Sequence, residues 1–211
     1  MMKKKLLLVL LLKLPFIFSG IFSSTSHADS PITSTSFYEP YLDIKIVQRA
    51  HLEGVMGIEI AEFLSSPENP IDVKAAVINA LSWKFEGKNN AEFYMYYLAL
   101  LYHVPFTELD TDFLSADEIF CLGYLMVIDN YFHPEIAIPL LEEAYEMKKD
   151  SFTISIILAL AKAQMMLDKD WCEVWKLTER VLRNKNLKQD LRPEATKLIL
   201  NYMILYKEYC K

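Results

Sequence analysis

The chain has 211 residues, of which 53% are hydrophobic and 24% are charged, and its formal net charge is −6. This composition is typical of a globular protein and excludes disordered, collagen-like and low-complexity chains. Its 5 glycines are scattered, so a glycine-rich fold that cradles phosphates or dinucleotides is not expected. An acidic chain is repelled by phosphate groups, so we expect no nucleic-acid partner.

The first 28 residues have the pattern of a secretory signal peptide. Met1–Lys5 is basic and Leu6–Leu12 is an unbroken aliphatic run. Small residues, Ser26 and Ala28, occupy the two positions that a signal peptidase reads. We therefore expect cleavage before Asp29 and export of the remainder.

The alternative for this segment is an uncleaved membrane anchor. A spanning helix needs about 20 apolar residues, and Lys13, Pro15 and Gly20 interrupt this one. No later apolar stretch reaches that length without a charge, so we expect a soluble mature chain with no stable membrane insertion. The lysine-rich start is typical of bacteria, which predicts a periplasmic or secreted protein.

Cleavage would make the protein more acidic. Residues 1–28 hold four lysines and no acid, so the remainder carries a net charge of −10. Residues 29–120 hold 15 acids and 5 bases, whereas residues 121–211 hold 13 of each. The negative charge is therefore expected at one end of the mature chain.

Three cysteines occur, at positions 121, 172 and 210, and none has a metal-binding spacing. Cys121 lies within an apolar helical pattern and is expected to be a small buried side chain. Cys172 and Cys210 both lie near the C-terminal end, where a bridge would leave one odd thiol. The sequence leaves open whether they form that bridge.

Residues 29–40 are polar and rich in serine and threonine, which predicts a flexible lead-in. From Tyr41 onward apolar residues recur at helical spacing, with no strand-like alternation. We expect an all-α fold of about nine helices, joined by short loops into antiparallel pairs, in a single domain over residues 41–211. The expected helices cover roughly residues 41–50, 55–64, 70–85, 91–103, 115–130, 134–147, 151–167, 171–183 and 191–209.

Helix boundaries follow from local signals. Asn69-Pro70 predicts a helix start, because proline fits the first turn. Gly87 and Pro105 are expected to end two helices. Ser115 and Glu118 form a capping-box pattern, in which each side chain accepts a hydrogen bond from the other's backbone amide.

A short helix motif recurs in the second half of the chain. Leu122-Gly123 recurs as Leu158-Ala159, 36 residues later, in the first helix of a pair. The second helix carries Ala137, Leu141 and Ala144, where small residues allow close helix approach. This spacing resembles tetratricopeptide repeats, including the Sel1-like type, and implies pairs stacked as a short α-solenoid.

The resemblance is best over residues 116–184. Met126 and Lys162 stand where the family has an aromatic residue, so an ordinary helical bundle is the alternative. In the family, the first helix of each pair lines a groove that binds a protein or peptide. Carried over by position, the groove residues here would be Asp117, Phe120, Tyr124, Val127, Ile156, Leu160 and Gln164.

The resemblance therefore implies a non-catalytic scaffold that docks an extended or helical segment of a partner. On this hypothesis Tyr124→Ala weakens partner binding and leaves the helical circular dichroism unchanged. Neither the partner nor the oligomeric state follows from the sequence.

The sequence offers no recognisable catalytic or metal-binding constellation. His51, His103 and His133 are not spaced as metal ligands, and Asp110 and Asp112 lack a calcium loop's central glycine. We expect no enzyme activity, no cofactor and no metal.

Two other functions remain as alternatives. One is a periplasmic inhibitor or immunity-type protein that blocks a toxin or hydrolase, using the acidic segment Phe106–Leu114. The other is a hydrolase whose carboxylates are dispersed along the chain.

The positions of the tyrosines are the last feature of the sequence that bears on function. Tyr94, Tyr97 and Leu101 share one helical face, and three tyrosines near the C-terminus share another. Most are expected to pack between helices, with their hydroxyl groups in water. The functional alternative is an exposed aromatic strip, because such residues anchor interfaces. The C-terminal tyrosines are Tyr202, Tyr206 and Tyr209.

Overall fold

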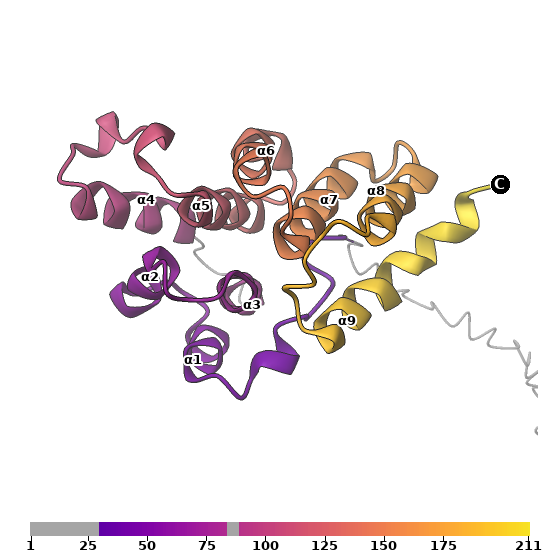
Figure 1. Ribbon diagram of the computed structural model, residues 1–211, viewed down its shortest axis with the longest axis horizontal. Helices are drawn as coiled ribbons and strands as arrows, with labels where there is room; N and C mark the ends of the chain where they lie inside the picture. Colours follow the sequence, from indigo (N-terminus) through magenta and orange to yellow (C-terminus); the bar gives the residue numbers. More distant parts are fainter. Residues whose placement is uncertain (1–29, 84–88) are drawn as a thin grey trace, which may run out of the picture.

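A computed structural model describes residues 30–83 and 89–211, and it confirms the predicted all-α fold (Figure 1). Within these ranges the chain forms nine α-helices and no β-strand. The α-helices are α1 (Lys45–Glu53), α2 (Ile58–Ser65), α3 (Ile71–Leu81), α4 (Asn90–Leu101), α5 (Ala116–Asp129), α6 (Ile138–Met147), α7 (Phe152–Met166), α8 (Trp171–Arg183) and α9 (Pro193–Met203). The 3-10 helices are η1 (Glu39–Tyr41), η2 (Phe106–Glu108), η3 (Thr111–Phe113), η4 (Pro134–Ile136) and η5 (Ile204–Tyr209).

Two expected features lie outside the described residues. The signal peptide and its cleavage before Asp29 belong to residues 1–29, and the expected helix stop at Gly87 belongs to residues 84–88. Among the described helices, none combines the length and apolar character needed to cross a membrane.

Neighbouring helices of the second half pack against one another. In Figure 1 helices α4 to α8 lie in a row, and α1 to α3 lie along one side of it. α5 packs mainly on α6 and α7 mainly on α8, and α6 also contacts α7. A Cβ at Gly123 of α5 would lie 3.1 Å from Leu141 Cγ of α6, so glycine permits this close approach.

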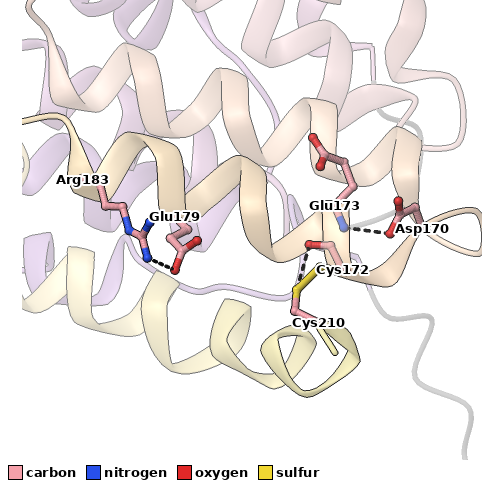
Figure 2. The surroundings of a disulfide bond; sticks show 6 residues. All are labelled: Asp170, Cys172, Glu173, Glu179, Arg183 and Cys210. Atoms are coloured by element: carbon pink, nitrogen blue, oxygen red, sulfur yellow. Dashed lines mark hydrogen bonds and ion pairs between the residues drawn. A yellow bond between two sulfur atoms is a disulfide. The ribbon is translucent and has the colours of Figure 1, made fainter.

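Side chains cap the first turns of three of the described α-helices. Ser115 Oγ accepts a hydrogen bond from the Glu118 amide, and Glu118 Oε2 accepts from the Ser115 amide at 2.8 Å. The predicted capping box at α5 is therefore confirmed. Ser151 and Asp170 cap α7 and α8 by accepting from the amide three residues later, and Figure 2 shows Asp170 doing so.

Two helix starts differ from the local signals. α6 begins at Ile138, because Pro139 has no N–H and fits only the first turn of a helix. Pro134 starts the short helix η4 instead. Before α3, Asn69 makes no cap and donates its side-chain amide to the Phe63 carbonyl at 2.8 Å.

The N-terminal segment, residues 30–41, is packed into the fold. Ile32, Phe37 and Tyr41 have no exposed surface. Figure 1 shows this segment (indigo) passing between α3 and α9 on its way to α1. The flexible lead-in expected at residues 29–40 is thus wrong for residues 30–40, because burial of these apolar side chains stabilises an ordered path.

A disulfide joins Cys172, at the start of α8, to Cys210 after η5 (Figure 2). The Trp171 ring lies 5.6 Å from the Tyr206 ring and 5.2 Å from the Tyr209 ring, measured between centroids. The bond and these rings hold the C-terminal turn against α8. The third cysteine, Cys121, is a free thiol in the core, as its apolar surroundings predict.

Candidate binding surfaces

Most of the groove residues expected from the repeat resemblance lie inside the protein. Six are buried, with exposed fractions of 8% or less, and only the seventh, Gln164, is partly exposed. These positions therefore belong to the core of this structure and offer no open face to a partner. The six are Asp117, Phe120, Tyr124, Val127, Ile156 and Leu160.

Helix α3 contributes to this burial, because it packs against both α5 and α7, and the N-terminal segment is bonded to α3 and to α7. Ser30 donates its hydroxyl to Gln164 Oε1 at 2.7 Å. The Asn79 side-chain amide of α3 donates to the Thr35 carbonyl at 3.1 Å and to the Tyr124 hydroxyl at 3.4 Å. Helix α3, together with the N-terminal segment, thus lies where the resemblance implied a partner.

Asp117 forms ion pairs with two lysines. Lys74 Nζ, which has no exposed surface, lies 3.0 Å from Asp117 Oδ2, and Lys148 Nζ lies 2.5 Å from Oδ1. Burial acts to raise the pKa of Asp117, but the hydrogen bonds and charges of Lys148 and Lys74 hold it below its usual value. Asp117 therefore joins α5 to α3 and to the end of α6.

The histidines are not gathered into a site. His103 follows α4 in the left-handed region, with φ 56°, and its side chain is exposed. His133 precedes η4, and its Nδ1 lies 3.1 Å from Glu135 Oε1 at the surface. Within residues 30–83 and 89–211, no group of three His, Cys, Asp or Glu side chains is placed to hold a metal ion.

The tyrosines divide between core and surface. Tyr94 is fully buried and receives a hydrogen bond from Ser65 Oγ at 3.1 Å. Tyr97 is half-buried and Leu101 is exposed, although the spacing places them on the same side of α4 as Tyr94. At the C-terminus Tyr206 is buried and Tyr209 is 50% exposed.

The outer side of α4 is an exposed apolar surface, here called the α4 face. Leu100 is 73% exposed and Tyr96 is 52% exposed, while Leu98 on the opposite side is buried. A helix that is apolar on nearly all sides is normally covered on all sides. The α4 face is therefore a candidate surface for a partner. It consists of Phe93, Tyr96, Tyr97, Leu100 and Leu101.

An acidic segment follows α4 and packs against it through η2. The Phe106 ring of η2 stacks on Tyr96, with centroids 4.1 Å apart, which holds the segment after α4 against this helix. That segment exposes Glu108, Asp110 and Asp112. Residues 89–147 contain eleven acidic residues and no lysine or arginine, so this stretch of the chain carries a net negative charge.

Two residues of the α4 face, Tyr97 and Leu101, were part of the aromatic strip considered from the sequence, but the binding groove was expected on α5 and α7. The signal for the α4 face was present, since residues 91–101 carry apolar side chains around almost the whole helix and a single acid, Glu92. The resemblance directed attention to α5 and α7 instead. The chain matches no protein-family model, and comparisons with curated proteins and with solved structures found no match.

Proposed function

We propose that this chain is an exported, non-catalytic helical scaffold that binds a protein partner through the α4 face. The observation that carries the proposal is the exposure of Leu100 and Tyr96 on a helix that is apolar on both sides. Exposed apolar patches rimmed by polar residues are typical of protein interfaces. Aromatic side chains such as Phe93 and Tyr96 are suited to anchor them.

The acidic residues in the segment after α4 indicate the kind of partner that would be complementary to this surface. Glu108, Asp110 and Asp112 are exposed in the segment that follows α4, and no lysine or arginine occurs between positions 89 and 147. A partner segment with an apolar stripe flanked by lysine or arginine is complementary to this surface. We therefore propose a basic amphipathic segment, with its apolar side on α4.

Export is supported by the disulfide between Cys172 and Cys210, because such bonds persist in oxidising compartments. We propose that residues 1–28 direct the chain to a bacterial periplasm or to the medium. A stacked tetratricopeptide-like solenoid is supported by the close approach of Gly123 to Leu141 and by the successive contacts from α5 to α8.

The proposal is tested by affinity capture from envelope and culture fractions of the source organism. Leu100→Asp places a charge in the α4 face, and Ile136→Asp is the matched control, because Ile136 is 62% exposed in η4. We expect a partner retained by the wild type and by Ile136→Asp, and bound about tenfold more weakly by Leu100→Asp. Equal retention by all three proteins contradicts the assignment to α4.

The captured partner also decides between a scaffold and an inhibitor. The inhibitor alternative is favoured by one observation, the exposure of Phe113 together with Asp110 and Asp112 in the segment Phe106–Leu114. An inhibitor is expected to bind an enzyme in a one-to-one complex and to stop its turnover. A scaffold is expected to leave the partner's activity unchanged.

A further inference from the structure

A pocket opens between α2, α4 and α5, next to the α4 face. Its volume is about 510 Å³, which lies within the usual range of small-ligand sites. Its lining combines carboxylates with aromatic rings and contains no basic side chain. The residues used below are Glu62, Tyr97, Leu101, Tyr102, Ser115 and Glu118.

The two adjacent carboxylates at the start of α5 differ in their partners. Asp117 is paired with two lysines. Glu118 is only 3% exposed, and its Oε2 accepts from the Ser115 amide at 2.8 Å, from the Ser115 hydroxyl at 2.7 Å and from the Tyr102 hydroxyl at 2.9 Å. All these donors are neutral, and Glu118 forms no ion pair within the described chain. Its charge is held by these hydrogen bonds and by the N-terminal end of α5, without a cationic side chain as partner among the described residues.

The negative charge of Glu118 is felt across the pocket. Burial raises the pKa of Tyr102 to about 12, helped by its hydrogen bond to Glu118, so Tyr102 remains a neutral donor. The pKa of Tyr97 is also raised, first by burial and then by the charges of Glu62 and Glu118. Glu62 is exposed at the rim, so the pocket presents a buried and an exposed carboxylate together.

A buried carboxylate without a positive partner is costly, and a cation beside it offsets that cost. The aromatic lining favours an organic cation, because the faces of tyrosine rings attract ammonium and guanidinium groups. Hard metal ions need more oxygen or nitrogen ligands than these two carboxylates. We propose that this pocket binds an alkylammonium or guanidinium group, with the charge facing Glu62 and Glu118 and the alkyl stem along Tyr97 and Leu101.

The cation has two possible sources, a basic side chain of a protein partner or a free small amine. The first source rests on the proposed function, since Tyr97 and Leu101 belong both to the α4 face and to the pocket. A lysine or arginine beside the apolar stripe of a docked segment would reach the pocket while the stripe covers α4. The site for the cation itself is independent of whether such a partner exists.

The test is a titration of the purified protein followed by nuclear magnetic resonance, with no partner present. The free probes are butylammonium and butylguanidinium, with 1-butanol as the neutral control and calcium chloride as the metal control. The peptide probes are blocked alanine peptides that carry one central arginine or, as control, one central glutamine. We expect both free cations and the arginine peptide to shift signals of α2, α4 and α5, and the neutral controls to shift none.

Variants assign the shifts to the pocket. Glu62→Gln and Tyr97→Leu alter exposed or half-exposed side chains, and each is expected to weaken binding about fivefold. Glu118→Gln keeps the capping pattern, because glutamine also caps at this position, and is expected to weaken binding further. Glu68→Gln is the matched control, since Glu68 is an exposed carboxylate that does not line the pocket.

The outcomes separate the pocket from the proposed function. Binding of the free cations alone assigns a small-amine site, and tighter binding of the arginine peptide assigns a side-chain site. If the cations bind but no partner is captured, the cation site is supported and the proposed docking of a partner on α4 is contradicted. Calcium binding in place of the organic cations, no binding at all, or binding unchanged in Glu62→Gln and Tyr97→Leu overturns the inference.

Discussion

The ammonium group of Lys74 lies 3.0 Å from the carboxylate of Asp117, and the lysine has no exposed surface. Asp117→Asn would leave this buried charge with a weaker, neutral partner. We expect the substitution to lower the free energy of unfolding by about 3 kcal/mol. Lys148→Met should cost at most about 1 kcal/mol, because the Lys148 side chain is partly exposed. Urea unfolding followed by circular dichroism measures both changes.

A double variant serves as the control for this pair. Lys74→Met with Asp117→Leu removes both buried charges, so it should recover much of the stability that Asp117→Asn loses. Loss of equal size in Asp117→Asn and Lys148→Met would show that the burial of Lys74 does not govern the effect.

The same carboxylate makes the fold sensitive to acid. Its pKa lies below the ordinary value of 3.8 in the folded protein and at about that value after unfolding. Its contribution to stability is therefore complete above the unfolded pKa and is lost as the pH falls through the folded pKa. We expect stability to fall less steeply below about pH 4 in Asp117→Asn than in the wild type. Urea midpoints measured at decreasing pH would give parallel curves if Asp117 had no such role.

Local signals predicted the helices well, and long-range contacts explain what they missed. Helical periodicity and the capping box of Ser115 and Glu118 depend on residues a few positions apart, so the sequence displays them directly. The path of the N-terminal segment depends on partners such as Gln164, which is 134 positions from Ser30. The polar composition of this segment predicted flexibility. The repeat resemblance then predicted that a partner, and not the chain itself, covers this side of α5 and α7.

Tyr124 now has a different expected phenotype. Because its side chain is fully buried, Tyr124→Ala should lower the free energy of unfolding by about 3–5 kcal/mol. Tyr124→Phe removes only the hydroxyl, whose bond to Asn79 is 3.4 Å long, so about 1 kcal/mol or less is expected. Thermal unfolding of the two variants tests this contrast. An unchanged melting temperature in Tyr124→Ala would contradict the burial of the Tyr124 side chain.

Asn79 fastens the N-terminal segment to α3. Its Oδ1 accepts from the Tyr38 amide at 3.1 Å, and its amide donates to the Thr35 carbonyl at 3.1 Å. Asn79→Ala leaves both backbone groups without this partner, and we expect a loss of about 2–3 kcal/mol with faster proteolysis near residues 30–41. Asn201→Ala, at an exposed position of α9, is the control and should change neither. Equal cleavage rates in the two variants would contradict this role.

The disulfide is expected to stabilise the C-terminal end of the fold. Cys172 and Cys210 are separated by 38 positions, and closing a loop of this length stabilises the folded state by about 3–4 kcal/mol. Replacing both by serine should therefore lower the unfolding midpoint in urea, whereas reduction of that variant should change nothing further. The buried thiol Cys121, whose pKa burial raises, should stay unreactive in the native protein. Two or three reactive thiols in the oxidised native protein would exclude this pairing.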